Sequence, residues 1–307
     1  HFANGQHIFY QELGGLRKIS IHLLQCRKVV HSHILKQQTV ITGYFYIQFG
    51  RIATLSSVPM ARRKSLAFLD VGQGDCFVAD TKSGAIIFDG GSSSEDQVGR
   101  YRILPYMKYL GYQKIQIAVI SHMDIDHYSG IKELLEMGKI KYLGLPEIPK
   151  DETMKKIIGI AKKRGTTIFY LSRGRQITTK DGSLKVLHPQ KNSQMEKNAA
   201  SLVMQGKILG YRVLLTGDVE KEGEEELLSE ELERADILKA AHHGSKNSTS
   251  NEFLQKVQPK QTVISCGKQN RYGHPHLETI HRLQTYRTKI YRTDRSGAII
   301  FFKRRDG

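Results

Sequence analysis

The chain has 307 residues, with 47 Lys and Arg against 30 Asp and Glu, which gives a formal net charge of +17. Charged residues make up an ordinary 25%, which excludes a disordered polyelectrolyte, and the length suits two domains or one large α/β domain with an extension. The basic excess favours a polyanionic partner such as nucleic acid, an anionic membrane surface or a wall polymer, although a merely basic protein has the same composition. Three cysteines without a CxxC pair predict neither a disulfide framework nor a cysteine zinc site.

The N-terminal segment, 1–65, is strongly basic, with nine basic residues and one acidic residue. Apolar and basic residues over 16–35 have roughly helical spacing, which fits a basic amphipathic helix on a membrane as well as a surface helix or linker. A strand is expected over 39–51 and a linker over 58–64. No apolar run approaches the ~20 residues of a membrane-spanning helix. We therefore interpret 1–65 as a basic extension or juxtamembrane linker without a transmembrane span.

From residue 66 the sequence changes to short apolar runs separated by turn residues and amphipathic segments, and we assign 66–307 to one folded domain. Strands are expected at 66–69, 76–79, 85–88, 115–121, 142–145, 166–171, 177–179, 184–188, 201–209, 211–215, 237–240, 262–265, 290–292 and 298–303. Helices are expected at 102–110, 129–137, 152–164, 221–232, 251–257 and 277–286. Many strands with interspersed helices favour an α/β (α+β) fold in which helices cover mixed sheets.

The segment 121–127 is the strongest candidate site. It holds His122, Asp124, Asp126 and His127 directly after a predicted buried strand. Open α/β sheets place their sites at the carboxyl ends of strands, and imidazoles and carboxylates are both ligands of divalent cations. A polar loop that only faces solvent rarely gathers four such residues. The segment therefore predicts a site for one or two divalent metal ions.

Other strand ends carry ligand-type residues as well. Asp218 follows the strand 211–215, His242 and His243 follow 237–240, and His274 comes after 262–265. Each of these residues alone has an ordinary explanation as a cap, turn or packing residue. Their joint placement after predicted strands is a much stronger indication of one metal site. Two glycine turns, at 72–74 and 89–91, lack the Gly-Lys-Ser/Thr of a phosphate-binding loop, and the second is expected beside the site.

The motif His122-x-Asp124-x-Asp126-His127 resembles the HxHxDH signature of the metallo-β-lactamase fold, with aspartate in place of the second histidine. From residue 69 to residue 302, the order and spacing of motifs also resemble the C-terminal domain of the ComEC family of DNA-uptake channel proteins. Cys76 stands where this family usually has serine. The segments that carry the resemblance are 69–75, 122–127, 198–203, 214–218, 242–245, 270–275 and 291–298.

The resemblance implies a metallo-β-lactamase-like αββα four-layer sandwich for the hydrolase domain 66–307, with the site at its edge. The metal ligands that it implies are His122, Asp124, Asp126, His127, Asp218 as a bridging ligand, and either His242 or His243. The residues with an implied catalytic role are Asp126, His127, Asp218 and His274. The residues expected to support the ligands or contact substrate are Asp70, Asp75, Asn198, Ser201, Lys239 and Ser245.

Several of these expectations have alternatives. Asp70 is expected to support the ligand loop. Lys239, His274 and the backbone at Ser245 are candidates to hold a phosphate or to protonate a leaving oxygen. A solvated side chain is the alternative for Lys239, and a structural turn residue is the alternative for His274.

The ligand set bears on the metal. The third histidine of the fold is replaced by Asn198, since His188 lies out of register, and Asp124 replaces the second. Oxygen ligands favour harder cations, so the sequence predicts Mn²⁺ over Zn²⁺, with Zn²⁺ as the other candidate.

By resemblance, the expected function is a metal-dependent phosphodiesterase, a deoxyribonuclease that degrades the DNA strand not imported during competence. The alternatives are a hydrolase of the same fold with another substrate (a wall phosphodiester, a lactone or a β-lactam) and a DNA-binding module with a weak site. The implied partners are single-stranded DNA, the membrane channel portion of the parent protein and other competence proteins, at the outer face of the cytoplasmic membrane. Basic side chains near the C-terminus, namely Arg282, Arg287 and Arg292, are expected to guide the phosphate backbone.

Overall fold

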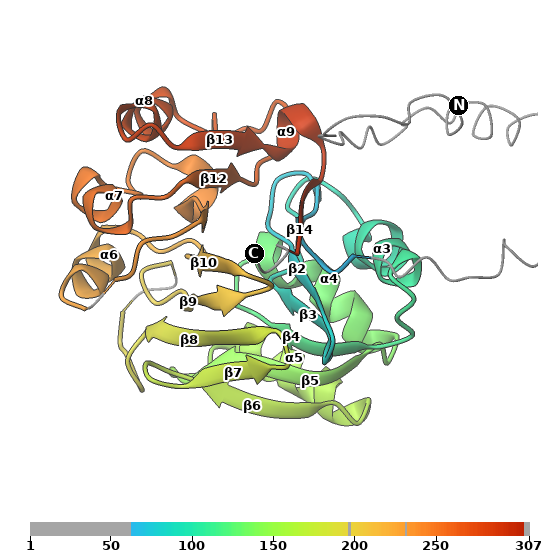
Figure 1. The fold of residues 1–307 in the computed structure, drawn as a ribbon. Helices are drawn as coiled ribbons and strands as arrows, with labels where there is room; N and C mark the ends of the chain where they lie inside the picture. Colours follow the sequence, from blue (N-terminus) through green and yellow to red (C-terminus); the bar gives the residue numbers. More distant parts are fainter. Residues whose placement is uncertain (1–62, 196–197, 231, 304–307) are drawn as a thin grey trace, which may run out of the picture. The chain divides into compact units, whose positions relative to one another are not determined.

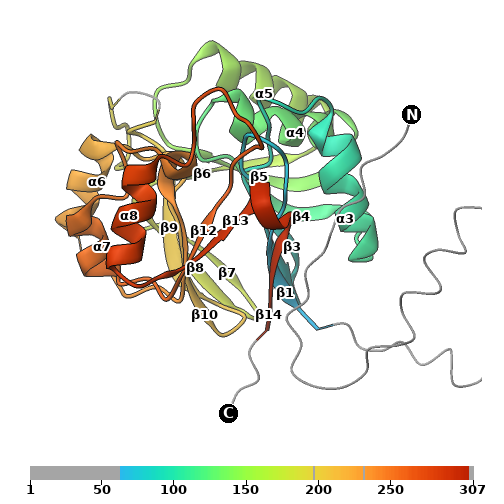
Figure 2. The same ribbon diagram turned by 90° about the horizontal axis from the view of Figure 1, so that it is seen from above.

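Two seven-stranded sheets lie face to face, with helices on both outer faces (Figures 1 and 2). The computed structural model describes residues 63–195, 198–230 and 232–303. The first sheet has the strand order β14-β1-β2-β3-β4-β5-β6, and the second has the order β13-β12-β11-β10-β9-β8-β7. The strands of the first sheet are β1 (Ser65–Phe68), β2 (Phe77–Thr81), β3 (Gly84–Phe88), β4 (Ile115–Val119), β5 (Ile140–Pro146), β6 (Thr167–Leu171) and β14 (Ile299–Phe302). Those of the second are β7 (Gln176–Thr179), β8 (Gly182–His188), β9 (Val203–Ile208), β10 (Tyr211–Leu215), β11 (Ile237–Lys239), β12 (Gln261–Ile264) and β13 (Lys289–Arg292).

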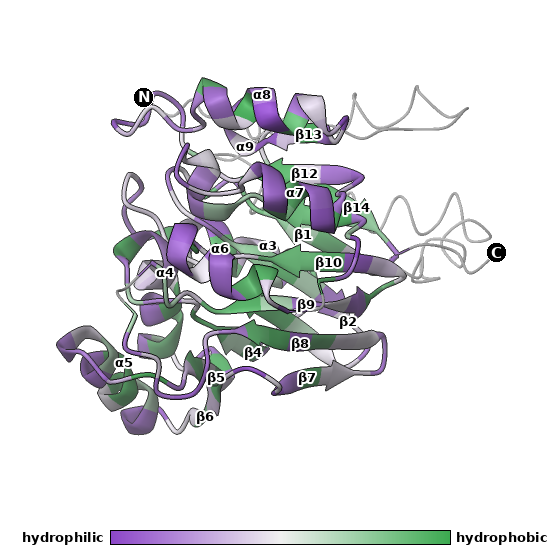
Figure 3. Cartoon of the chain, turned by 90° about the vertical axis from the view of Figure 1, so that its left-hand side faces the viewer, coloured by the Kyte–Doolittle hydropathy of each residue, from purple (hydrophilic) through white to green (hydrophobic). Residues whose placement is uncertain are grey.

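Three apolar layers hold these elements together. The first lies between the first sheet and its helices and includes Met107, Leu134 and Ile157. The second lies between the two sheets, and the third lies between the second sheet and its helices, with Phe253 and Leu283. Figure 3 shows apolar strands inside and helices with hydrophilic outer faces. The helices are η2 (Gly99–Ile103), α3 (Leu104–Tyr109), α4 (Ile125–Glu136), α5 (Glu152–Lys163), α6 (Lys221–Leu228), η3 (Ala241–Gly244), α7 (Asn251–Val257), α8 (Leu277–Thr285) and α9 (Thr293–Ser296).

This arrangement confirms the predicted αββα four-layer sandwich, and the strand directions explain where its site lies. Strands β3 to β6 are parallel neighbours in the first sheet, and β10 to β13 are parallel neighbours in the second. The carboxyl ends of parallel strands meet at one edge of a sheet. The segments after β3, β4, β10, β11 and β12 therefore carry their polar residues to that edge.

Helix α4 begins earlier than predicted and changes the setting of the central motif. It starts at Ile125, directly after its N-cap Asp124, whereas the sequence predicted a helix from 129. Asp126 and His127 therefore lie in the first helical turn and not in a loop. A carboxylate in a first turn is favourable because it faces the positive end of the helix dipole.

The predictions for the N-terminal segment lie almost entirely outside the described residues. The helix over 16–35, the strand over 39–51 and most of the linker over 58–64 precede residue 63. The domain boundary after residue 65 and the character of the extension stay predictions. Within the described part of the chain, no helix combines the length and hydropathy needed to cross a membrane.

Candidate metal centre

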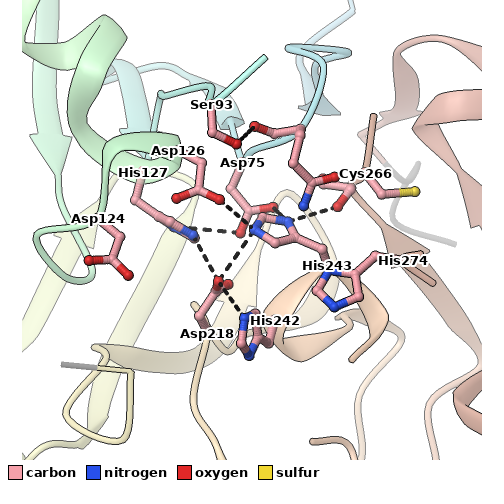
Figure 4. Close-up of polar contacts among 12 residues, drawn as sticks. Asp75, Ser93, Asp124, Asp126, His127, Asp218, His242, His243, Cys266 and His274 are labelled. Atoms are coloured by element: carbon pink, nitrogen blue, oxygen red, sulfur yellow. Dashed lines mark hydrogen bonds and ion pairs between the residues drawn. The ribbon is translucent and has the colours of Figure 1, made fainter. Parts of the chain in front are cut away.

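Three histidines converge on one oxygen of Asp218 where the two sheets meet (Figure 4). Asp218 Oδ2 lies 3.1 Å from Nε2 of His127, 3.3 Å from Nε2 of His243 and 3.9 Å from Nε2 of His242. His122 joins them, because its ring lies 4.1 Å from the ring of His127 and it groups with His127 and Asp218. The segments after β4, β10 and β11 are thus brought to one point, as the sequence predicted.

Each of these imidazoles is held through its Nδ1 atom, which leaves Nε2 directed at the centre. Metal-ligating histidines commonly have such a partner, which fixes the orientation and tautomer of the ring. The Nδ1 partners are Asp89 Oδ2 for His127 (3.0 Å), the Ser265 carbonyl for His243 (2.9 Å), Ser121 Oγ for His122 (3.0 Å) and Glu220 Oε1 for His242 (2.9 Å).

The donor set fits a divalent cation. The Nε2 atoms of His122, His127 and His243 are buried and make no well-oriented hydrogen bond within the protein. Buried polar atoms without partners are costly, and one or two cations held by the groups below would give these atoms partners. Among the described residues, four groups of three side chains bring ligand atoms within 4.8 Å of one another: His122–His127–Asp218, Asp126–His127–His243, Asp75–Asp218–His243 and Asp75–Asp89–His127. Overlapping groups of this kind suit one or two divalent ions.

Two of the predicted ligands lie at the rim of this cluster. Asp124 Oδ2 is 3.7 Å from His122 Nε2, and its side chain is 36% exposed. His242 is 24% exposed, whereas His243 is 1% exposed and belongs to two of the ligand groups. His243 thus lies deeper in the cluster than His242, and both stay candidate ligands.

The carboxylates and imidazoles of the centre shift one another's pKa values toward their charged forms. Burial acts against a charged imidazole, yet Asp218 and Asp89 raise the pKa of His127 well above its ordinary value. Burial likewise opposes the charge on His243, but Asp218 and Asp75 raise its pKa well above the usual range. Against the effect of burial, His243 and His127 lower the pKa of Asp126 to about 2. The centre therefore contains ionised carboxylates beside imidazolium groups whose protons a cation would have to displace.

Lys239 lies beside the candidate ligands, as expected of a residue that supports them. Its side chain is only 4% exposed, so the alternative of a solvated side chain is excluded. Its ammonium group contacts the carboxylate of Asp75, lies 3.3 Å from Asp218 Oδ1 and donates to the Gly217 carbonyl at 2.9 Å. Lys239 thus occupies one oxygen of Asp218 and leaves Oδ2 for the histidines. Asp75, predicted to support the ligands, does lie in the cluster.

Asp70 does not lie among the residues that the structure brings together at the centre. Its carboxylate accepts a hydrogen bond of 3.2 Å from the backbone N–H of Gly72, within the turn after β1. Asp89, in contrast, contacts a candidate ligand directly: it is fully buried, holds His127 and accepts a 2.7 Å hydrogen bond from the Ser121 N–H. The supporting role expected of Asp70 stays a prediction. The sequence placed the turn at 89–91 beside the site but did not single out its aspartate.

The remaining predicted residues have mixed positions. Ser201 Oγ accepts a 3.3 Å hydrogen bond from the Asp218 N–H, so Ser201 positions the central carboxylate. The Ser245 N–H donates to the His242 carbonyl at 2.8 Å, and the Ser245 hydroxyl accepts from the Asn247 N–H. Ser245 is therefore engaged in its own turn, which does not support the predicted contact with a phosphate.

Asn198 and His274 lie on the side of the centre where His242 is found. The Asn198 side-chain amide donates to Glu220 Oε1 at 3.3 Å, and its oxygen is buried without a hydrogen-bond partner. The ring of His274 lies 5.4 Å from that of His242 and 6.2 Å from that of His243. Burial and the neighbouring histidines lower the pKa of His274 to about 4, so at neutral pH its imidazole is uncharged and has no extra proton to give. That argues against His274 as the group that protonates a leaving oxygen.

Comparison with known proteins agrees with this geometry. Residues 69–268 match the metallo-beta-lactamase superfamily, and the chain belongs to it. Its relatives include "ComE operon protein 3" of Bacillus subtilis, 37% identical over 259 residues, and "Competence protein ComA" of Neisseria gonorrhoeae, 30% identical over 248 residues. Both matches cover 78% of this chain, but 33% and 32% of the relatives, so the chain spans about a third of their length. The resemblance to the ComEC family is thereby confirmed.

Solved structures share the fold at low sequence identity. YhfI from Bacillus subtilis, a metallo-beta-lactamase fold protein, has a TM-score of 0.52 and 13% identity, over 77% of this chain and 99% of that one. CmlA, a diiron beta-hydroxylase from Streptomyces venezuelae, has a TM-score of 0.51 and 11% identity, over 85% of this chain and 59% of that one. At this level of identity, these similarities show only the fold of the chain.

Proposed function

We propose that this chain is a metal-dependent phosphodiesterase that cleaves DNA and degrades the strand that is not taken up during competence. The observation that carries the proposal is the convergence of His127 and His243 on Asp218 Oδ2. Asp126, with a side chain 17% exposed, is a partly accessible member of the same cluster. The names of the competence relatives support DNA as the substrate.

The chain's own residues prepare the centre for such chemistry. A bound divalent cation supplies a lowered pKa for its water and neutralises charge on phosphoryl oxygens. Asp89, Ser265 and Lys239 fix the orientation of His127, His243 and Asp218, so little rearrangement is needed on binding. Preorganised groups of this kind lower the cost of reaching the transition state.

We propose Mn²⁺ as the preferred metal, with one or two ions bound and Zn²⁺ as the weaker activator. Carboxylates supply much of the donor set, through Asp75, Asp126 and Asp218, and the carboxamide oxygen of Asn198 is buried nearby. Oxygen donors favour harder cations than a centre built on imidazoles alone.

The parent protein would hold this chain beside a membrane channel, at the outer face of the cytoplasmic membrane. DNA, the channel portion and other competence proteins would then be its partners. The relatives, about three times as long as the matched region, support this arrangement through their names as competence proteins.

The test is cleavage of labelled single-stranded and double-stranded DNA with Mn²⁺ or Zn²⁺. Asp126→Asn is the inactivating variant, and Glu252→Gln, on the exposed face of α7, is the matched control. Cleavage by the wild type and by Glu252→Gln, but not by Asp126→Asn, is the expected result. Binding without metal-dependent cleavage would identify a DNA-binding module. Neither binding nor cleavage would indicate a hydrolase with another substrate, such as a wall phosphodiester, a lactone or a β-lactam.

A further inference from the structure

We propose that Tyr272 and Arg271 form a subsite for one nucleotide of a single strand, in which the base stacks on the Tyr272 ring and the guanidinium of Arg271 binds the backbone phosphate. The inference rests on the proposed function, because it assigns a position to the strand that the metal centre would cleave.

Three rings lead from the metal centre to the surface. The ring of His243, 1% exposed, lies 6.2 Å from that of His274 at an interplanar angle of 29°. The ring of His274, 9% exposed, lies 5.7 Å from that of Tyr272 at 23°. Tyr272 is 43% exposed and ends the row. His274 stacks on this ring and the Arg271 guanidinium also lies over it. A base extends the row outward when the guanidinium moves from the ring to the backbone phosphate.

The turn that carries Tyr272 is held in place. Asn270 Oδ1 accepts a 2.9 Å hydrogen bond from the His274 N–H, and Asn270 Nδ2 donates to the carbonyls of His274 and Gly267 at 2.6 and 2.9 Å. A rigid ring loses little conformational entropy when a base stacks on it. The geometry therefore suits binding better than a mobile surface tyrosine would.

One cationic side chain contacts this ring. The guanidinium carbon of Arg271 lies 4.9 Å from the centre of the Tyr272 ring, and its Nη2 donates to the Tyr272 hydroxyl at 2.7 Å. Lys268 in the same turn and Lys246 on the adjoining turn are exposed, and the Lys246 N–H donates to His276 Nδ1. Within the described parts of the chain, Arg271 has no carboxylate in ion-pair contact. Its charge is therefore available to a phosphate.

These features favour a single strand over a duplex. Aromatic side chains beside cationic ones bind single strands with little regard to sequence, because every base has a π-face. A base in a duplex is stacked and paired and cannot reach such a ring without being extruded. Two ring-to-ring steps separate Tyr272 from His243, a span comparable to one or two nucleotides. The stacked base would therefore lie close to the phosphate at the metal centre.

The experiment measures the binding of a fluorescent oligothymidylate, with metal chelated, to the wild type, Tyr272→Ala, Tyr272→Phe and Arg271→Ala. Tyr109→Ala is the matched control, because Tyr109 is 66% exposed on α3 and also stacks on another ring, that of Tyr106, at 6.1 Å. We expect Tyr272→Ala to bind about 5- to 100-fold more weakly, as loss of one stacked base predicts. Tyr272→Phe and Tyr109→Ala should bind like the wild type. Arg271→Ala should weaken binding and reduce its salt dependence.

A series of oligonucleotides with one abasic position completes the test. Removing the base at one position should lower the DNA affinity of the wild type. Removing the base at that same position should leave the DNA affinity of Tyr272→Ala unchanged. Wild-type affinity in Tyr272→Ala, or an abasic effect that persists in that variant, overturns the subsite while leaving the proposed function intact. A Tyr272→Ala variant that keeps its affinity for the oligonucleotide but binds metal more weakly would show that the ring only packs on His274. A wild type that neither binds nor cleaves any DNA overturns the proposed function, and the subsite falls with it.

Discussion

Glu220 joins two residues beside the candidate metal centre: its Oε1 lies 2.9 Å from His242 Nδ1 and accepts a 3.3 Å hydrogen bond from the Asn198 amide. By the resemblance, Asn198 is expected to replace the third histidine of the fold, and His242 Nε2 lies 3.9 Å from Asp218 Oδ2. One carboxylate oxygen thus sets the orientation of both. An acidic residue just before a helix is a common feature, so the sequence alone does not mark Glu220 as part of the site.

Replacing Glu220 should therefore weaken metal binding. Carboxylates that orient a ligating histidine typically contribute about 10- to 100-fold to metal affinity. We expect Glu220→Ala to lose Mn²⁺ affinity in this range, measured by competition with a chelating dye. Glu222→Gln, two residues on and exposed on α6, is the control and should bind like the wild type. Equal affinities in wild type and Glu220→Ala would show that Glu220 does not position the centre.

A second prediction decides between the two aspartates considered as support for the ligands. Asp89→Asn weakens the 3.0 Å contact with His127 Nδ1, which is buried and has few other ways to be oriented. We expect this variant to bind Mn²⁺ about 10- to 100-fold more weakly. Asp70→Asn keeps an oxygen that accepts from the Gly72 N–H and should match the wild type. If Asp70→Asn loses as much affinity as Asp89→Asn, the assignment of support to Asp89 is wrong.

Metal binding should release protons. Although burial acts against it, neighbouring carboxylates raise the pKa of His127 and His243 well above the ordinary value, which favours the imidazolium form of both rings. A cation needs these rings neutral, so the affinity should rise with pH as the protons become easier to remove. Calorimetry at pH 7 in buffers of different ionisation enthalpy should report a net release of protons on metal binding. A binding enthalpy that is the same in all buffers would contradict this.

Lys239 should contribute more to the stability of the protein without metal than to that of the metal-bound protein. Its loss would leave the buried carboxylates of Asp75 and Asp218 without their ammonium partner. Breaking a buried ion pair in this way costs about 3–5 kcal/mol. We expect Lys239→Met to lower the melting temperature sharply with a chelator present and to recover part of the loss with Mn²⁺. Lys260→Met, which removes a 63% exposed lysine from its pair with Asp236, should cost less than about 1 kcal/mol. Equal destabilisation by the two variants would refute the role given to Lys239.

The sequence predicts which candidate ligands lie together more readily than which contacts hold them, for a physical reason. Apolar runs mark buried strands, and the residues that follow parallel strands must meet at one edge, so His127, Asp218 and the pair His242–His243 are predicted to lie together. Supporting contacts depend on side-chain direction, which tertiary packing decides. Lys239 follows two apolar residues and turns inward. Arg282, expected to guide DNA, instead donates to the carbonyls of Thr249, Lys246 and Ser248.

The same limit applies to the other basic residues near the C-terminus. Arg292 is paired with Asp294 at 2.6 Å, so its charge is already offset, and Arg287 is exposed. Net charge along the chain predicts a polyanionic partner, but it does not tell which side chains are available to it. Of Arg282, Arg287 and Arg292, only Arg287 therefore stays a candidate to guide the phosphate backbone of DNA.

The last prediction concerns the choice of metal. Asn198 donates through its amide nitrogen to Glu220, and its oxygen is buried without a partner, which fits an oxygen donor near the centre. Asn198→His would restore the histidine that the fold has at this place, and its imidazole can still donate to Glu220. Because imidazole suits Zn²⁺ whereas carbonyl oxygen suits Mn²⁺, the variant should bind Zn²⁺ more tightly relative to Mn²⁺ than the wild type does. Competition between the two ions, with Asn247→His on the nearby turn as control, measures the ratio. An unchanged ratio would mean that Asn198 does not contribute to metal selection, and the preference for Mn²⁺ would then rest on the carboxylates.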